Sequence, residues 1–469
     1  MLFNSLEFAL FFPIVTILYF LLPHKFRWFH LLLVSCIFYM AFVPVYILIL
    51  FFTIVIDYYA GIFIENATGK ARKRYLAISI VANVGVLVVF KYYNFFIENI
   101  NTLLYNFHVS SNGFCYLNIL LPVGLSFHTF QAMSYTIEIY RGNQKAERHF
   151  GIYSLYVMFY PQLVAGPIER PQNILHQFYE KHSFDYSRVI AGLSRMLFGF
   201  FKKVVIADRL GLYVDGVYNN LERHNSVSIA IAVVFFAIQI FCDFSGYSDI
   251  ALGSAKVMGF ELMENFKQPF RSKSVTEFWR KWHISLSTWF NDYLFTPFIV
   301  KFRELDKMSV VLGLLITFTL SGLWHGAGWN FAIYGIAHGV ILVFEFLTKK
   351  QRKKLSSKIP NKLFSIVCIF ATFIFVSLSW IFFRSPNVSS SFSVIKSLTS
   401  LNMGKIDFST VESFNYFSLF VVLFSIVYMF KIEANEIWQK KPMLFSMMHF
   451  SAILALGVFN KTSFIYFQF

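Results

Sequence analysis

One stretch of the sequence decides the fold: WFHLLLVSCIFYMAFVPVYILILFFTIVI, residues 28–56, which contains no Asp, Glu, Lys or Arg. The apolar run continues past Asp57 to Ile64. A membrane-spanning helix needs about 20 mostly apolar residues. The run is therefore too long for one helix and too short for two full helices with a loop. Pro44 marks the expected break, because proline ends or kinks a helix, and the run predicts two shortened, tilted or kinked helices in a bilayer.

The composition of the whole chain also indicates a membrane protein. Of 469 residues, 57% are hydrophobic and only 14% are charged, whereas a soluble domain carries about 25% charged residues. We expect an all-α integral membrane protein with about 11–13 transmembrane or re-entrant helices. It is expected to form a single polytopic domain over residues 1–469, with a core motif region at 120–345. Candidate segments begin near Leu6, Trp28, Val45, Tyr75, Leu117, Tyr153, Val189, Val227, Met308, Trp329, Leu363, Tyr416 and Met443.

The net charge of +16 comes from basic residues in the short breaks between apolar runs. Two such breaks lie at 70–74 and 349–362. Clusters of this kind are typical of cytoplasmic loops, which also meet anionic lipid headgroups. Because no basic module lies outside this pattern, lipid is expected as a partner and nucleic acid is not.

Two kinds of chemistry are not expected from this sequence. The cysteines, Cys36, Cys115, Cys242 and Cys368, lie in or beside apolar runs and form no CxxC pair, which favours inert buried thiols over metal ligands or disulfides. The signatures of soluble nucleotide-binding proteins, serine hydrolases and zinc proteases are absent. We expect no metal and no tightly bound cofactor, and the sequence assigns no cofactor-binding residues.

Polar side chains inside apolar segments are costly, so they are candidates for function. The first such stretch is LSGLWHGAGWN, residues 320–330, which follows a charge-free span from Met308. His325 lies at the end of that span, between glycines that permit close backbone approach. An imidazole can accept and return a proton near neutral pH, which acyl transfer to a hydroxyl requires. The alternative is a buried histidine that is hydrogen-bonded to a backbone carbonyl.

The second stretch is SVTEFWRKWHISLS, residues 274–287. Ser274 and Glu277 have the spacing of a capping box, which predicts that a helix starts here. This helix would be interfacial or re-entrant, with Trp at headgroup level. His283 is either a second polar group of a catalytic site or an interfacial histidine. The 3–4 spacing predicts one helical face formed by Trp279, His283, Leu286 and Phe290.

Two further stretches place polar groups or helix breakers in apolar sequence. DFSGYSD, residues 243–249, carries Asp243 and Asp249, whose carboxylates need partners, expected from Arg271, Arg280 or Lys281. They belong either to a site or to a structural ion pair. YPQLVAGPIER, residues 160–170, cannot be helical throughout, and it is either a re-entrant segment that lines a cavity or a loop at the membrane surface.

Taken together, these stretches resemble the membrane-bound O-acyltransferases, specifically the bacterial branch that includes alginate O-acetyltransferase. The resemblance covers the whole chain, and the order of the motifs agrees. The segments that carry it are Met1–Phe8, Phe90–Phe96, Gly124–Gly142, Pro161–Pro171, Asp243–Gly253, Gln268–Ser287, Leu320–Asn330 and Phe464–Phe469.

The resemblance implies a ring of helices around a central catalytic tunnel that both histidines face. The family's Leu-Trp-His-Gly setting falls on His325, implied as the general base, and its Trp-His-Ile-Ser setting falls on His283, implied to orient the acceptor or the donor carbonyl. His128 stands where this branch has an aromatic residue, and no role is assigned to it. The substrate or tunnel residues expected are Trp279, Trp282, Trp324, Trp329, Asn330, Asp243, Ser245, Tyr247 and Asp249.

The resemblance also implies a reaction and a location. A multi-pass protein of the bacterial inner membrane would take an acetyl group from a cytoplasmic donor, expected to be acetyl-CoA, for O-acetylation of a cell-surface polysaccharide such as alginate. A periplasmic or other extracytoplasmic acetyltransferase partner would complete the transfer. The alternatives are peptidoglycan O-acetylation, D-alanyl transfer to teichoic acid and, outside the enzymes, a transporter of polysaccharide or lipid-linked sugar.

Overall fold

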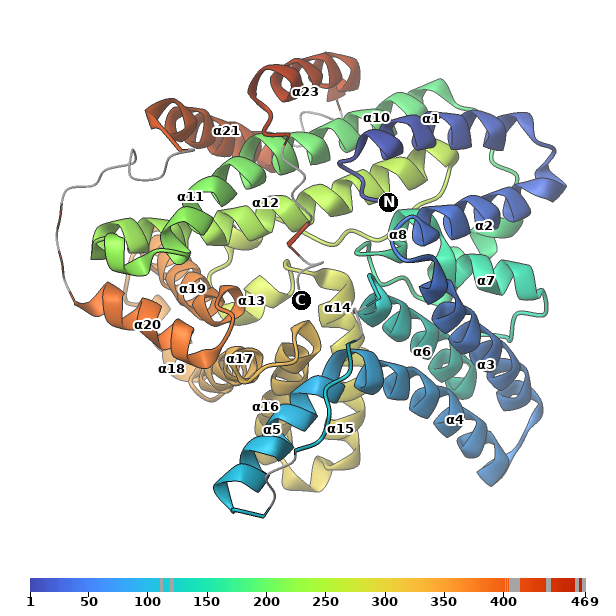
Figure 1. Ribbon diagram of the computed structural model, residues 1–469, viewed down its shortest axis with the longest axis horizontal. Coiled ribbons are helices and arrows are strands. Elements are labelled where there is room, and N and C mark those ends of the chain that lie inside the picture. Colours follow the sequence, from blue (N-terminus) through green and yellow to red (C-terminus); the bar gives the residue numbers. More distant parts are fainter. Residues whose placement is uncertain are drawn as a thin grey trace. The chain divides into compact units, whose positions relative to one another are not determined.

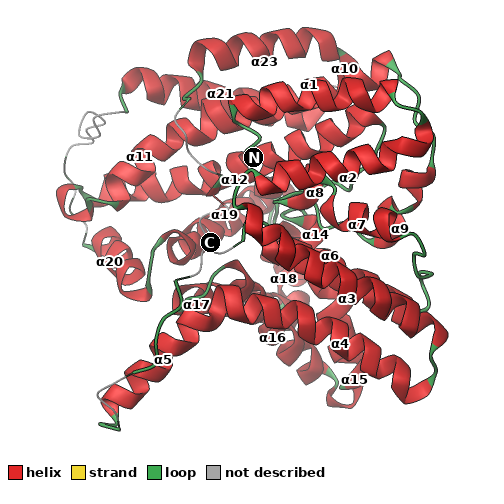
Figure 2. Ribbon diagram, turned by 45° about the vertical axis from the view of Figure 1, so that its right-hand side comes forward, coloured by secondary structure: helices red, strands yellow, loops and turns green. Residues whose placement is uncertain are grey.

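The computed structural model describes residues 1–109, 113–118, 122–400, 402, 404, 414–435, 440–459 and 464–465. These residues form helices joined by turns and loops, and none of them lies in a strand (Figure 2). Their contacts divide the chain into two compact units. Unit 1 comprises Met1–Gly192 with Ser254–Met263, and unit 2 comprises Leu193–Gly253 with Glu264–Phe469. A single domain over the whole chain stays a prediction.

Unit 1 contains the helices of the first part of the chain (Figure 1). They are α1 (Leu6–Leu21), α2 (His24–Met40), α3 (Ile47–Asn66), α4 (Gly69–Leu87), α5 (Tyr93–Asn106), α6 (Leu125–Arg141), α7 (Phe150–Met158), α8 (Tyr160–Leu163), α9 (Pro171–Ile174) and the start of α10 (Tyr186–Phe200). The predicted break at Pro44 is confirmed, because α2 ends at Met40 and a 3-10 turn, Pro44–Tyr46, precedes α3.

Unit 2 holds most of the polar motifs. Its helices are α11 (Asp208–Tyr218), α12 (Ser226–Met258, whose last turns belong to unit 1), α13 (Val275–Trp279), α14 (Ile284–Phe290), α15 (Thr296–Lys301), α16 (Lys307–His325), α17 (Trp329–Leu347), α18 (Lys349–Ser356), α19 (Asn361–Arg384), α20 (Val388–Thr399), α21 (Tyr416–Asn435) and α23 (Pro442–Leu456). Of the segment 464–469, only Phe464 and Ile465 lie within the described residues.

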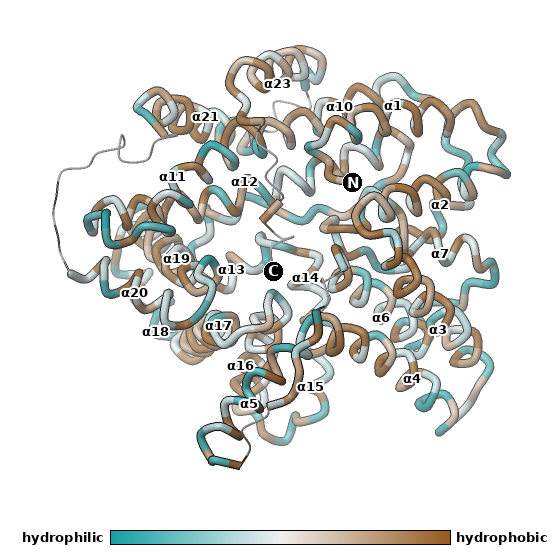
Figure 3. The backbone as a smooth tube through the Cα atoms, in the orientation of Figure 1, coloured by the Kyte–Doolittle hydropathy of each residue, from teal (hydrophilic) through white to brown (hydrophobic). Residues whose placement is uncertain are grey.

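Seven helical segments of the described chain are long and apolar enough to cross a membrane. They are Pro44–Asn66, Gly69–Asn106, Ser226–Met258, Lys307–His325, Trp329–Leu347, Asn361–Arg384 and Tyr416–Ala434. Two shorter apolar helices are Leu6–Leu21 and Pro442–Leu456. Figure 3 shows apolar residues along most helices, with hydrophilic residues gathered at loops and helix ends.

The helix surfaces show why the chain needs lipid around it. On α1, Phe8, Phe12 and Tyr19 are buried, whereas Leu10 and Ile17 are about 60% exposed. A soluble helix would place polar residues on such an exposed face. An apolar face outside the protein core is stable in hydrocarbon, where it contacts lipid tails instead of water.

A π-helical turn, Phe201–Ala207, joins α10 to α11 and faces α12. Gly199 and Gly246 allow this close approach. A Cβ atom on Gly199 would lie 2.5 Å from the carbonyl oxygen of Gly246, so any larger residue would push the helices apart. Because a π turn is wider than an α turn, the consecutive residues Lys202 and Lys203 both reach carboxylates of α12.

The segment of residues 160–170 lies inside unit 1. Only Tyr160–Leu163 is helical, and the side chains from Tyr160 to Glu169 are all buried. Tyr156 Oη donates a hydrogen bond to the carbonyl oxygen of Glu169, and the Glu169 carboxylate accepts one from the backbone N–H of Met263. The buried environment contradicts a surface loop and supports non-helical backbone that is enclosed by protein.

A second buried polar cluster of unit 1 joins α3, α4 and α6. The carboxylate of Asp57 on α3 accepts hydrogen bonds from Ser79 Oγ at 2.6 Å and from Asn83 Nδ2 at 2.8 Å. One turn earlier, Thr53 lies 2.7 Å from His128 Nε2 on α6. These bonds hold three helices together, and His128 takes part in them through a threonine of α3.

Candidate active site

His325 is the last residue of α16, and its ring lies among aromatic side chains. The residue is 5% exposed. Its ring centroid lies 4.9 Å from Trp324, 5.1 Å from Phe383 on α19 and 6.1 Å from Tyr334 on α17. The helix ends here because Gly326 adopts an extended conformation. The predicted position of His325 at a helix end between glycines is therefore confirmed.

Two glycines bring α16 and α17 together beside this ring. The helices lie side by side (Figure 1). A Cβ atom on Gly322 would lie 2.3 Å from the carbonyl oxygen of Phe331, and one on Gly335 would lie 2.3 Å from that of Phe318. Only glycine fits at both positions. The close packing places Tyr334 against His325.

His283 lies in a turn, and the predicted continuous helix through it is wrong. The helix start at Ser274 is confirmed, since Ser274 Oγ accepts a hydrogen bond from the backbone N–H of Glu277 at 3.0 Å. However, α13 ends at Trp279, and α14 begins only after His283, whose φ is +44°. A non-glycine residue in this left-handed region is uncommon and is strained by about 1–3 kcal/mol.

Backbone hydrogen bonds from residues 265–267, which precede α13, explain why the helix breaks. The backbone N–H of Lys267 donates to the carbonyl oxygen of Lys281 at 2.9 Å, and that of Ile284 donates to Asn265 O at 2.9 Å. These two bonds replace those that a continuous helix would make. The Asn265 side-chain oxygen also lies 3.1 Å from His283 Nδ1 and 2.9 Å from Ser285 Oγ.

The structure brings the two predicted histidines to one indole. The centroid of Trp324 lies 4.9 Å from that of His325 and 6.2 Å from that of His283. His283 is fully buried, and Phe244 of α12 packs edge-on against it with a centroid distance of 4.7 Å. Residues 283 and 325 are far apart in the sequence, yet they flank the same side chain.

The other predicted tryptophans have different settings. Trp279 donates a hydrogen bond from Nε1 to His338 Nδ1 at 3.2 Å. Trp282 is buried and lies 4.9 Å from Trp380 between ring centroids. Trp329 is 59% exposed at the start of α17.

Asn330 holds the end of α19. Its amide donates to the carbonyl oxygens of Phe382 at 3.0 Å and Ser385 at 2.9 Å. Both bonds are to backbone atoms, so the geometry gives Asn330 a part in joining α17 to α19.

The two aspartates of α12 are held by cations that sequence reasoning did not select. Asp249 lies 3.0 Å from Arg195 Nε and 2.8 Å from Lys202 Nζ, and Asp243 lies 2.7 Å from Lys203 Nζ. The expectation that Arg271, Arg280 or Lys281 would pair with these acids is therefore wrong. The cations belong to α10 and the π turn, which precede α12 in the sequence, whereas the expected partners follow it.

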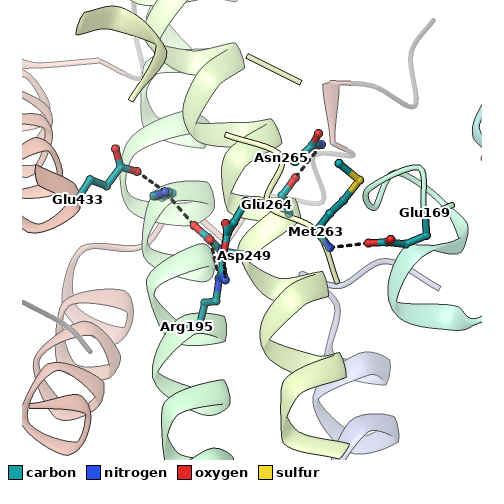
Figure 4. Close-up of polar contacts among 9 residues, drawn as sticks. Glu169, Arg195, Asp249, Met263, Glu264, Asn265 and Glu433 are labelled. Carbon is teal, nitrogen blue, oxygen red and sulfur yellow. Dashed lines mark hydrogen bonds and ion pairs between the residues drawn. The ribbon is translucent and has the colours of Figure 1, made fainter. Parts of the chain in front are cut away.

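The ion pairs extend beyond α12. Arg195 forms a second, bidentate pair with Glu264, with nitrogen–oxygen distances of 2.6 and 2.7 Å. Lys202 also reaches Glu433 of α21 at 2.5 Å. Figure 4 shows Glu433, Asp249, Arg195 and Glu264 in this network. The network supports the interpretation of the two aspartates as structural ion pairs. Removing one partner would leave an uncompensated buried charge, so each pair holds its helices together.

Ser245 and Tyr247 lie between the two aspartates and are buried. Tyr247 packs edge-on against Phe464, with a centroid distance of 4.8 Å. The backbone N–H of Ile465 donates to the Asp243 carboxylate at 2.8 Å. This part of the motif thus anchors the described residues of the chain's last segment on α12.

Comparison with known proteins identifies the chain's relatives. The sequence profile of the membrane-bound O-acyltransferase family matches residues 144–385. The chain belongs to this family.

Three relatives of this acyltransferase are named for different acceptors. It is 36% identical to the probable alginate O-acetylase of Pseudomonas syringae over 83% of its own length and 73% of the relative's. It is 32% identical to the peptidoglycan O-acetyltransferase of Helicobacter pylori, over 79% of its length and 73% of the relative's. The teichoic acid D-alanyltransferase of Bacillus subtilis is 28% identical, over 57% of this chain and 69% of the relative. The protein is a multi-pass membrane acyltransferase. Its family membership supports an enzyme and not a transporter.

A pocket of about 850 Å³ lies within unit 2 of this acyltransferase. One wall is a row along α16 formed by Val310, Leu314, Thr317 and Ser321. Residues three or four apart lie on one helix face, so the next residue of the row is at position 324 or 325. The wall of the pocket therefore runs along α16 toward His325.

Positive charge lines the same pocket. Arg280, Lys349 and Arg352 are among its lining residues, together with Glu345. The Glu345 carboxylate accepts hydrogen bonds from the backbone N–H groups of Val275 at 2.8 Å and Thr276 at 2.9 Å, so it caps the start of α13. The pocket thus combines apolar helix faces with cationic groups, a combination that suits an elongated anionic ligand.

Glu277 also stabilises the start of α13. Burial would raise the pKa of its carboxyl, but hydrogen bonds from Lys281 Nζ at 2.6 Å and from the backbone N–H of Lys273 at 2.8 Å outweigh burial. The pKa of Glu277 therefore lies below its usual value. The carboxylate stays charged at neutral pH and supports the helix that carries Trp279.

Sequence reasoning missed two side chains of this region. His338 accepts from Trp279 and lies 3.0 Å from Ser379 Oγ through Nε2. It is a polar residue in the middle of the apolar segment 329–347, a signal that could have selected it. Asn265 lies in a polar loop after α12, where no periodicity or motif spacing distinguishes it.

Proposed function

We propose that this membrane-bound O-acyltransferase moves an acetyl group from cytoplasmic acetyl-CoA across the bacterial inner membrane for O-acetylation of a cell-surface polysaccharide such as alginate. The observation that carries the proposal is the meeting of His325 and His283 at one indole. A pocket with cationic lining residues supports it, because its wall along α16 reaches Ser321, one turn before His325. The similarity to proteins named as alginate O-acetylases supports the acetyl group and the acceptor.

His325 is proposed as the general base of the transfer. Its imidazole takes the proton of the acceptor hydroxyl while the hydroxyl oxygen bonds to the thioester carbonyl carbon. The carbon–sulfur bond then breaks, and the leaving thiolate takes the proton from the imidazolium. Proton transfer of this kind contributes about 10²–10⁴-fold to a rate. The surrounding rings of Trp324, Tyr334 and Phe383 exclude water and so limit hydrolysis of the thioester.

The pocket of unit 2 is proposed as the donor site. Arg280, Lys349 and Arg352 would attract the phosphates of acetyl-CoA. The row from Val310 to Ser321 would guide the apolar arm that carries the thioester toward His325. The basic break at 349–362 supports a cytoplasmic position for this end of the pocket, because cytoplasmic loops carry the excess of Lys and Arg. In the cell an extracytoplasmic acetyltransferase partner would complete transfer to the polymer, whereas a soluble alginate oligosaccharide would offer its hydroxyl to this protein directly.

The test uses the full-length protein in lipid vesicles with acetyl-CoA that is labelled in the acetyl group. Alginate oligosaccharide, a peptidoglycan fragment and water serve as competing acceptors. Ester-linked label is measured on the two carbohydrates, and transfer to water is measured as free labelled acetate. The proposal expects label on the alginate oligosaccharide. Label on the peptidoglycan fragment alone would favour the function named for the Helicobacter pylori relative. If no acceptor received acetyl from acetyl-CoA, and D-alanine was instead transferred from a carrier loaded with it, the proposal of acetyl-CoA as the donor would be overturned.

A further inference from the structure

The Asn265 side chain makes three contacts with the turn that carries His283. Its Oδ1 atom lies 3.1 Å from His283 Nδ1, 3.2 Å from the backbone nitrogen of Ser285 and 2.9 Å from Ser285 Oγ. Its backbone carbonyl accepts the N–H of Ile284 at 2.9 Å. One residue therefore binds three consecutive positions of the turn. This binding accounts for the persistence of the left-handed conformation at His283, because strained residues need surroundings that over-determine them.

One of these contacts fixes the orientation of the amide. The backbone N–H of Ser285 can only donate a hydrogen bond, so the atom of Asn265 that faces it must be the carbonyl oxygen. The same oxygen faces His283 Nδ1. An oxygen without a hydrogen can only accept. Ser285 Oγ also lies 3.5 Å from His283 Nδ1, but it donates its hydrogen to the same Asn265 oxygen at 2.9 Å, so Nδ1 carries a proton of its own. In a neutral imidazole the lone pair then lies on Nε2.

Asn265 is itself fixed through its neighbour in the chain. Glu264 forms the bidentate pair with Arg195, and Arg195 also pairs with Asp249 of α12 (Figure 4). A bidentate pair restrains both the position and the direction of the groups that it joins. The ion-pair network and the turn of His283 therefore meet at two adjacent residues, Glu264 and Asn265.

We infer that Asn265 is a positioning residue that holds His283 as the Nδ1-protonated tautomer, so that Nε2 accepts a hydrogen bond from the acceptor hydroxyl. This inference rests on the proposed function and decides between the two roles open to His283. A neutral ring with its proton on Nδ1 has no Nε2 hydrogen to donate to the thioester carbonyl. It can accept from an alcohol, and it therefore orients the acceptor and not the donor.

Three variants separate positioning from a structural role. Asn265→Leu removes the acceptor oxygen at similar volume, whereas Asn265→Asp keeps an oxygen that accepts from Nδ1. Asn387→Leu is the matched control, because Asn387 Oδ1 likewise accepts a backbone N–H, from Ser390 at 2.9 Å, at the start of α20. Rates are measured in vesicles with acetyl-CoA and alginate oligosaccharide, each varied separately.

We expect Asn265→Leu to lower kcat/KM for the oligosaccharide about tenfold to a hundredfold, the cost of a misplaced group near the chemistry. KM for acetyl-CoA should stay within about twofold. Asn265→Asp should keep most of the wild-type rate, and Asn387→Leu should leave both constants unchanged. Equal losses for the Leu and Asp variants, or a loss confined to acetyl-CoA, would overturn the inference.

A spectroscopic measurement keeps the inference testable if Asn265→Leu does not fold. Solid-state nitrogen spectra of the full chain with ¹⁵N-labelled histidine, compared with His283→Gln, identify the signals of His283. The wild-type ring should show a protonated Nδ1 and an unprotonated Nε2, and the opposite tautomer would overturn the inference. This readout needs no turnover, so it distinguishes failure of the tautomer assignment from failure of the acetyl-transfer proposal.

Discussion

The end of α16 and the turn between α13 and α14 each present a histidine to Trp324, but they hold it by different means. The ring of His325 lies among Trp324, Tyr334 and Phe383. The ring of His283 is fixed by the Asn265 amide and a strained backbone. Aromatic contacts restrain the position of an imidazole ring, whereas a hydrogen bond to a side-chain amide also fixes the state of one ring nitrogen. In the proposed mechanism the first region transfers the proton and the second orients the acceptor.

Replacement of His325 should have the largest effect. His325→Ala is expected to lower kcat for acetyl transfer by about 10²–10⁴-fold, because the acceptor hydroxyl loses its base. The measurement is ester-linked acetate formed per unit of membrane-inserted protein in vesicles. His325→Gln controls for the cavity that alanine leaves. Wild-type rates in both variants would contradict the role of His325 as the general base.

Replacement of His283 should have a smaller effect on the same reaction. His283→Ala is expected to lower the rate about tenfold to a hundredfold, since an oriented acceptor is lost while the base remains. The exposed His176 offers a control, and His176→Ala should match the wild-type rate. A loss for His283→Ala that equals or exceeds that of His325→Ala would reverse the two assigned roles.

Trp324 tests whether the two regions act together. Trp324→Phe is expected to lower the rate about tenfold, because both rings lose part of the surface that they share. The loss in Trp324→Phe combined with His283→Ala should be less than the product of the single losses, as is usual for residues in contact. Trp28→Phe is the control, because this indole packs against His149 at 4.6 Å in unit 1. Fully multiplicative losses at Trp324 would show that the regions act independently.

The smallest effect concerns the stability of the turn region. Glu277 has a lowered pKa in the folded protein, so its contribution to stability is present above its ordinary pKa of about 4.3 and is lost as the pH falls through the folded pKa. Glu277→Gln should cost less than about 1 kcal/mol at pH 7, because the Lys281 pair is partly exposed. Hydrogen exchange of α13 should show a difference from wild type that shrinks toward pH 4. A difference that grows as the pH falls would contradict the assigned charge.

The features that could be predicted from the sequence are those set by local physics. The apolar run of 28–56, the break at Pro44, the helix start at Ser274 and the helix end at His325 follow from length, proline, capping and glycine. Each depends on residues within a few positions of the feature. The family resemblance then selected both histidines, whose setting beside Trp324 the structure supplies.

The features that could not be predicted depend on partners distant in the sequence. The 3–4 spacing from Trp279 to Phe290 is a valid helical pattern, but hydrogen bonds from the segment 265–267 override it. The expected partners of Asp243 and Asp249 lie downstream of α12 in the sequence, whereas the cations that pair with them lie upstream, on α10 and the π turn. Exposure of Trp329 follows from the direction in which α17 begins, which its neighbours in the sequence do not determine.

The π turn of Phe201–Ala207 has a consequence for how this protein can change over time. Deleting one residue there would restore ordinary helical winding and rotate either Lys202 or Lys203 away from α12. Asp243 would lose its lysine inside a bilayer if Lys203 turned away, and Asp249 would be left with Arg195 if Lys202 did, each at a cost in stability. The length of this short segment is thus constrained as strictly as the identity of its two lysines, and insertions or deletions should be tolerated in the connecting loops well before they are tolerated here.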